Sequence, residues 1–139
     1  MRINGEWCLC DDGITRPTIL VDVLAADGSN CKNQFIIDSG ADRTVFTSDL
    51  LNQLGLTSDA PAGIKLVGVG GRQAFVNVQT VLEFVCDDRR TIRVRGDFAA
   101  FTDPTALDMS VLGRDVTNNF DLILSRPRNE VTLLAAPHR

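Results

Sequence analysis

The residues best suited to chemistry stand together as Asp38-Ser39-Gly40. A carboxylate is followed by a hydroxyl and by a glycine, which lets the backbone turn tightly and lets another chain approach closely. The preceding apolar run Phe35-Ile36-Ile37 predicts a buried strand that would hold the carboxylate rigidly at its end. A carboxylate in that position suits general acid or base catalysis. An ordinary Asp-Ser-Gly turn at the end of a strand is the alternative from these residues alone.

The composition indicates one globular domain with enough length for a hydrophobic core. The chain has 139 residues, of which 44% are hydrophobic and 23% are charged. Its net charge of -4 gives no reason to expect nucleic acid or an anionic membrane as a partner. No apolar run approaches the roughly 20 residues that a membrane span requires.

The first residues and the cysteines bear on location and metal binding. Residues 1–10 include Arg2 and Glu6 and lack the apolar segment of a secretory signal, which favours the cytoplasm. There are four cysteines, and the single histidine lies far away at position 138, which makes a poor zinc site. We therefore expect no metal and interpret the thiols as structural or incidental, with a redox or metal role as the lesser alternative.

Hydrophobic patterns predict the elements that would position Asp38. Residues 18–24 alternate as a strand with Ile19, Val21 and Val23 on one face, and a turn at 26–30 returns the chain into a second strand at 34–37. After the short apolar pair at 45–46, capping residues at 47–48 and Gly55 enclose a predicted helix at 49–54.

Further short strands are predicted at 78–86, 91–95, 109–112, 121–125 and 131–134, with a short apolar segment at 98–101 and a second short helix at 116–120. The four arginines within 89–95 favour a solvated sheet face rather than a binding patch. Many short strands with one or two short helices predict an all-β fold, a small closed β-barrel.

A glycine-rich segment at 64–76 predicts a hairpin with a flexible tip at Val69, Gly70, Gly71 and Arg72. Three glycines within four positions exceed what a simple turn needs, so we interpret the hairpin as a mobile flap over a cleft. The pattern is a poor phosphate loop, because it lacks the Lys-Ser/Thr ending and opens no helix.

Four segments now follow one another in a recognisable order. They are Arg16-Pro17 before a strand, Asp38-Ser39-Gly40-Ala41-Asp42 after the next strand, the glycine-rich hairpin, and Val111-Leu112-Gly113-Arg114-Asp115. This order resembles the retropepsin-like aspartic proteases, the single-domain branch of retroviral type, over roughly residues 15–120. The resemblance implies a barrel of the acid-protease type and an aspartic endopeptidase.

The resemblance also implies roles for individual residues. Asp38 would be the catalytic aspartate, with Ser39, Gly40 and Ala41 supporting the active-site loop. Asp42 would contact the main chain of the substrate and pair with Arg114. Arg16 matches an arginine that reaches across the dimer to that same aspartate, and Val69, Gly70, Gly71 and Arg72 would form the flap over a polypeptide substrate.

The chemistry of this family requires two carboxylates about 3 Å apart that share one proton. This chain holds one Asp-Ser-Gly triplet, so the second Asp38 should come from a second copy in a homodimer. No metal or organic cofactor is needed. The predicted organisation is an N-terminal arm at 1–15, the protease domain at 16–134 and a tail at 135–139.

Two alternatives stay open. The first is a retropepsin-like dimerisation or peptide-binding module with negligible catalysis, because one fold can host several functions. The second is a generic small β-barrel. The hairpin at 121–134 departs from retroviral enzymes, which end in a short strand of the dimer sheet, so it could build a different interface or cover the place of the partner's strands.

Overall fold

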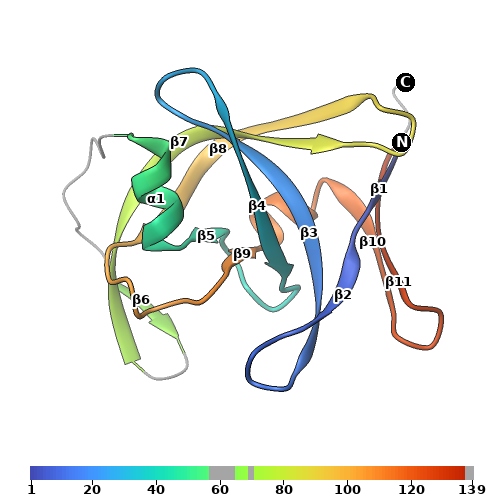
Figure 1. The fold of residues 1–139 in the computed structure, drawn as a ribbon, viewed down its shortest axis with the longest axis horizontal. Coiled ribbons are helices and arrows are strands. Elements are labelled where there is room, and N and C mark those ends of the chain that lie inside the picture. Colours follow the sequence, from blue (N-terminus) through green and yellow to red (C-terminus); the bar gives the residue numbers. More distant parts are fainter. Residues whose placement is uncertain (57–64, 69–70, 137–139) are drawn as a thin grey trace.

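The protein is built mainly of strands. The structure is a computed structural model and describes residues 1–56, 65–68 and 71–136 (Figure 1). In chain order its elements are β1 (Arg2–Asn4), β2 (Glu6–Leu9), β3 (Thr15–Leu24), β4 (Asn30–Ile37), β5 (Val45–Phe46), α1 (Ser48–Leu54), β6 (Lys65–Gly68), β7 (Gly71–Val85), β8 (Thr91–Phe101), β9 (Ser110–Leu112), α2 (Arg114–Thr117), β10 (Phe120–Ser125) and β11 (Glu130–Ala135).

Six of these strands close into a barrel in the order β3-β4-β9-β5-β8-β7. The barrel closes because β3 also pairs with β7, at Asp22–Glu83 and Val23–Leu82. The hairpins β3–β4 and β7–β8 are antiparallel, whereas β9 runs parallel to β4, and β5 runs parallel to β8. The predicted all-β closed barrel with short helices is confirmed.

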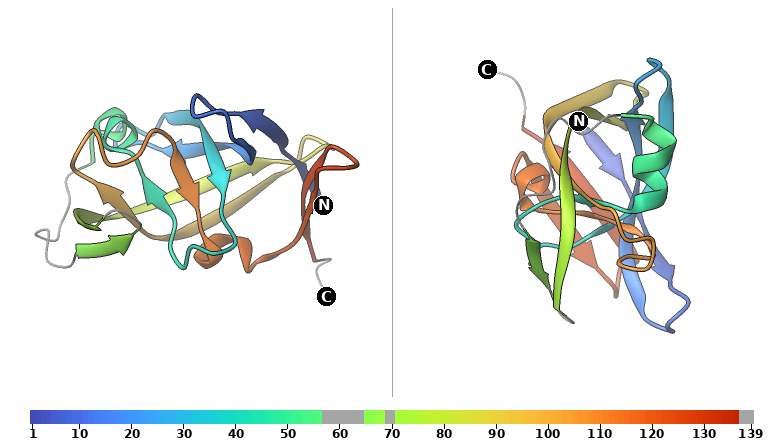
Figure 2. Two further views of the ribbon diagram at one scale, coloured as in Figure 1. Left: turned by 90° about the horizontal axis from the view of Figure 1, so that it is seen from below. Right: turned by 90° about the vertical axis from the view of Figure 1, so that its left-hand side faces the viewer.

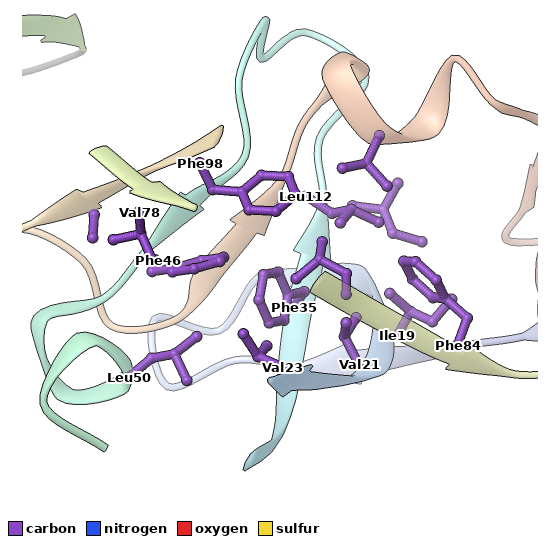
Figure 3. Close-up of a cluster of buried hydrophobic side chains, with 14 of the residues drawn as sticks. Ile19, Val21, Val23, Phe35, Phe46, Leu50, Val78, Phe84, Phe98 and Leu112 are labelled. Carbon is purple, nitrogen blue, oxygen red and sulfur yellow. The ribbon is translucent and has the colours of Figure 1, made fainter. Parts of the chain in front are cut away.

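The core lies inside this barrel. Ile19, Val21 and Val23 are each at most 1% exposed, which confirms the face predicted from their alternation. Phe35 lies in the same cluster and meets the ring of Phe46 edge-on, with 5.9 Å between centroids (Figure 3). Burying each such side chain contributes about 1.5–3 kcal/mol to folding. Strand β4 is therefore firmly anchored just before it delivers Asp38.

Helix α1 is where its capping residues place it. Thr47 is the N-cap and its hydroxyl accepts a hydrogen bond from Leu50 N at 3.2 Å, while Gly55 ends the helix with a φ of 62°. The second helix was predicted too late in the sequence. Helix α2 begins at Arg114, directly after Gly113, and Phe120 already belongs to β10, where its ring packs edge-on against Phe84 at 5.7 Å.

A second, three-stranded sheet joins the two ends of the chain in the order β1-β11-β10. The sequence indicated no strands in residues 1–15, yet β1 pairs with β11 and β2 pairs with β3. Trp7 ties this region to the C-terminal hairpin, because its Nε1 donates to the carbonyl oxygens of Ser125 and Glu130 at 3.2 and 3.1 Å. The left view in Figure 2 places this sheet at one end of the barrel.

The apolar segment at 98–101 is the continuation of β8, which therefore extends beyond the strand predicted at 91–95. In residues 1–56, 65–68 and 71–136 no helix has the length and apolar character to cross a membrane, and no cluster of potential ligands could hold a metal ion. All four cysteines are free thiols, and burial raises the pKa of the Cys86 thiol.

Candidate active site

Asp38 lies at the end of β4 and is exposed together with Ser39 and Gly40. Its backbone is held on both sides, since Asp38 N donates to Leu112 O at 3.1 Å and Asp38 O accepts from Ala41 N at 3.1 Å. Its carboxylate oxygen Oδ1 accepts a hydrogen bond from Gly40 N at 2.9 Å. The carboxylate is therefore oriented by the tight turn that the sequence predicted and is presented to the outside.

Strands β4, β9 and β5 support the Asp38 loop. Strand β9 lies between β4 and β5, parallel to the first and antiparallel to the second. Ile37 pairs with Leu112, and Val45 pairs with Val111, so the loop from Asp38 to Thr44 leaves on one side of β9 and returns on the other. Leu112 is fully buried. Residues far apart in sequence thus form one rigid base for Asp38.

Gly113 allows the two parts of this base to touch. A Cβ atom at this position would lie 2.4 Å from the carbonyl carbon of Arg43 and 2.8 Å from Thr44 N. These neighbours are backbone atoms and cannot rotate away. The glycine in the Val111–Asp115 motif is therefore needed for the close approach of the β9–α2 turn to the Asp38 loop.

A hydroxyl and a carboxylate lock this contact. The Thr44 hydroxyl donates to Asp115 Oδ1 at 2.7 Å and accepts from Gly113 N at 3.0 Å, and Thr44 N donates to the same carboxylate at 2.9 Å. Thr44 is fully buried. Sequence reasoning assigned neither residue a role. The available signal was the position of Asp115 inside the motif, whereas nothing local marks Thr44, because its partner is distant in sequence.

Asp42 and Arg114 are brought together as predicted from the resemblance. Their side chains form an ion pair, and Arg114 N donates to Ala41 O at 2.8 Å. Asp115 N donates to Asp42 O at 3.2 Å. The first amides of α2 therefore bind carbonyl oxygens of the Asp38 loop, so that the helix start and the loop hold one another in place.

Arg16 binds an acid of its own chain. Its guanidinium makes two hydrogen bonds to the Asp12 carboxylate, at 2.9 and 2.7 Å, and lies in the hairpin formed by β2 and β3. This hydrogen bonding lowers the pKa of Asp12 to about 2. To contact Asp42 of a second copy, Arg16 would have to leave the Asp12 carboxylate or bind both carboxylates at once.

The predicted flap is a hairpin in the part that the structure describes. Strands β6 and β7 pair antiparallel from Lys65–Ala74 to Gly68–Gly71. Gly71 is the first residue of β7. Val69 and Gly70 lie outside the described residues, as does the side chain of Arg72. The function predicted for these residues stays a prediction.

The arrangement presents one exposed carboxylate from a rigid loop. A hollow of about 570 Å³ is lined by residues from the end of β3, from the turn that follows it and from β7 and β8, among them Leu24, Thr80 and Asp97. None of the predicted site residues lines this hollow, so it is not part of the candidate active site.

Comparison with known proteins shows the family of this chain. The family model described as aspartyl protease matches residues 23–116. This chain belongs to the aspartyl protease family. The matched segment runs from the end of β3 through the Asp38 loop to α2. No curated protein matches the chain.

Solved structures show that this family member has the retropepsin-like fold. EIAV protease, solved in complex with the inhibitor HBY-793, is 22% identical with a TM-score of 0.53, and the match covers 78% of this chain and 93% of that one. A retropepsin-like aspartic protease from Rickettsia conorii is 17% identical with a TM-score of 0.60, covering 96% and 88%. The retroviral protease-like domain of Ddi1 from Leishmania major is 17% identical with a TM-score of 0.57, covering 87% and 95%.

Proposed function

We propose that this aspartyl protease family member is an active endopeptidase whose site is assembled from two copies of the chain. The observation that carries the proposal is the Asp38 loop. It presents an exposed carboxylate on a base of three strands, and the chain has one such Asp-Ser-Gly triplet. The substrate is a polypeptide bound in extended form.

The proposed chemistry is the addition of water to a peptide bond. One Asp38 carboxylate takes a proton from the attacking water, while the other, protonated, donates to the carbonyl oxygen of the substrate. The resulting tetrahedral intermediate breaks down when its nitrogen is protonated and the carbon–nitrogen bond cleaves. Two carboxylates so close cannot both be charged, so the pair shares one proton and titrates as a unit.

The hairpin β6–β7 supports the proposal that the substrate is a polypeptide bound in extended form. An extended peptide between this hairpin and the Asp38 loop could add backbone hydrogen bonds in the manner of a strand. Closing the hairpin would exclude bulk water from the reaction. Asp42, which is 80% exposed beside its partner Arg114, is available for the substrate main chain.

The C-terminal sheet offers an edge for the second copy. On its β1 side, Arg2 O accepts a hydrogen bond from Asp87 N at 2.9 Å, so the turn after β7 covers that edge. Strand β10 pairs with β11 on one side, and in the described part of the chain no other strand pairs with its outer side. Leu124, on β10, is 37% exposed. An unpaired edge with apolar side chains favours pairing with its own copy across a two-fold axis.

Substitution of Asp38 tests the proposal. Wild-type protein and Asp38→Asn should be compared on a library of extended peptides from about pH 3 to pH 7, the range in which aspartic dyads work. We expect cleavage by the wild type and none by the variant, with equal thermal stability of the two proteins. Absence of cleavage by the wild type across the library, or cleavage by Asp38→Asn, would contradict the proposal.

A further inference from the structure

Arg43 belongs to the Asp38 loop and is held in a defined position. Its guanidinium carbon lies 5.5 Å from the centroid of the Phe75 ring, over its face, and Nη2 donates to Asn77 Oδ1 at 3.2 Å. Phe75 is buried, so the ring beneath the guanidinium is fixed. A cation over an aromatic face is attracted to it by the ring's quadrupole. The side chain is therefore preorganised without a carboxylate.

The contacts place this cation between the Asp38 loop and the hairpin. Strand β8 lies between β5 and β7, and Ala99 pairs with Val45 on one side and with Asn77 on the other. Arg43, just before β5, consequently reaches across β8 to β7. Strand β7 begins in the β6–β7 hairpin. The residues that the guanidinium contacts, Phe75 and Asn77, come directly after the paired part of that hairpin, which ends at Ala74.

An apolar surface accompanies the charge. Phe75, Ala99 and Phe101 form a small buried cluster separate from the barrel core. Val45, Ala106 and Leu107 pack against it and are themselves only partly buried. A side chain bound here would meet methyl groups along its stem and a guanidinium at its end.

The charge on Arg43 is not neutralised by the part of the chain that the structure describes. Arg2, Arg16, Arg90, Arg93, Arg114 and Arg128 each have a carboxylate within 4.0 Å. Among the described residues no carboxylate pairs with Arg43 in this way. Asn77 occupies one of its five N–H donors with a neutral amide oxygen. The remaining donors suit the two oxygens of a carboxylate.

We infer that Arg43 selects an acidic side chain of the polypeptide substrate, at a position close to the bond that is cleaved. Glutamate fits better than aspartate, because its methylene groups can cover the apolar surface beside Val45 while its carboxylate reaches the guanidinium. The inference rests on the proposed function and adds to it the chemical class of the substrate.

The test uses a synthetic peptide library in which each position carries Glu, Gln or Lys in turn. Wild-type protein should cleave peptides with Glu at one position with a kcat/KM about 10-fold or more above the Gln peptides, as expected for a charge-assisted hydrogen bond. The preference should fade as the pH falls below the pKa of the peptide glutamate, about 4.3. A wild type indifferent to charge at every position would overturn the inference.

Variants separate selection from a structural role. Arg43→Gln should abolish the preference and Arg43→Glu should turn it towards Lys, while Arg95→Gln, at an exposed arginine on β8, should keep it. If Arg43 only braced the loop, Arg43→Gln would reduce cleavage of all peptides equally, and the preference for Glu would persist. That outcome overturns the inference and leaves the endopeptidase proposal intact.

Peptide binding tests the selection of an acidic side chain separately from cleavage. Fluorescence polarisation of the same labelled peptides with the wild type should show about 10-fold tighter binding of the Glu peptide. Selective binding without any cleavage would support the inference and contradict the proposed function. Protein that neither cleaves nor binds any member of the library would overturn both.

Discussion

Replacing Thr44 with valine tests whether its buried hydroxyl holds the active-site loop together. Valine keeps the shape of threonine but can neither donate to Asp115 Oδ1 nor accept from Gly113 N, the two hydrogen bonds of 2.7 and 3.0 Å made by the hydroxyl. Losing a hydrogen bond to a charged group costs about 1.5–3 kcal/mol, and a buried N–H left without a partner costs about 1–3 kcal/mol.

These two free-energy costs do not simply add. Thr44 N donates to the Asp115 carboxylate at 2.9 Å, and valine keeps this backbone N–H, so the charge should keep part of its hydrogen bonding. We therefore expect Thr44→Val to lower the free energy of unfolding by about 2–4 kcal/mol. Thr44→Ser keeps the hydroxyl and should lose only about 1 kcal/mol for the missing methyl group.

Urea unfolding at one fixed protein concentration is the assay, because a dimer would make stability depend on concentration. Thr80→Val is a second control, since Thr80 is buried and its hydroxyl donates one bond, to Leu24 O at 2.6 Å. That variant should lose about 1 kcal/mol. A Thr44→Val protein no less stable than Thr44→Ser would show that the hydroxyl does not hold the loop together.

Three further predictions concern other parts of the molecule. Gly113→Ala should destabilise the chain by about 3 kcal/mol or more in urea unfolding, because its Cβ would lie 2.4 Å from a backbone carbon; a loss below that of Gly40→Ala, whose Cβ meets only the Asp38 side chain at 3.2 Å, would contradict this. Leu124→Glu should dissociate the proposed dimer in sedimentation experiments, because it places like charges at the β10 edge. Leu20→Glu, at a leucine that is 55% exposed on β3, should leave the dimer intact. Equal behaviour of both variants would argue against the β10 edge as the dimer interface. Hydrogen bonding to Arg16 lowers the pKa of Asp12 from 3.8 to about 2, so the contribution of this pair to stability is complete above the unfolded pKa and is lost as the pH falls through about 2. The melting temperature of Asp12→Asn should therefore lie slightly below that of the wild type at neutral pH and match it near pH 2. A difference in melting temperature that stays constant with pH would contradict this prediction.

The parts of the fold that could be predicted are those with a local signal. Strand β3 alternates in its own sequence, and α1 has both caps within its own segment, so neither depends on distant residues. The retropepsin-like barrel then follows from the order of such segments together with two motifs. These motifs also led to Asp38, Asp42 and Arg114, whose roles in catalysis are proposed here.

The parts that could not be predicted depend on partners distant in sequence. Strand β1 has one buried residue, Ile3, and is a strand because β11 lies beside it. Helix α2 begins at Arg114 because its first amides find the carbonyl oxygens of the Asp38 loop, which no local pattern encodes. Thr44 is an ordinary threonine in the sequence and becomes part of the site only through Asp115 and Gly113.

The central claim is that each active site needs two Asp38 carboxylates, one from each copy of the chain. Mixing a fixed amount of wild type with increasing Asp38→Asn protein, after equilibration of subunits, tests this directly. If mixed dimers are inactive, peptide cleavage falls to about one half at equal amounts and to about one tenth at a nine-fold excess of the variant. Cleavage that stays constant across the titration would show that one chain suffices and would contradict the claim.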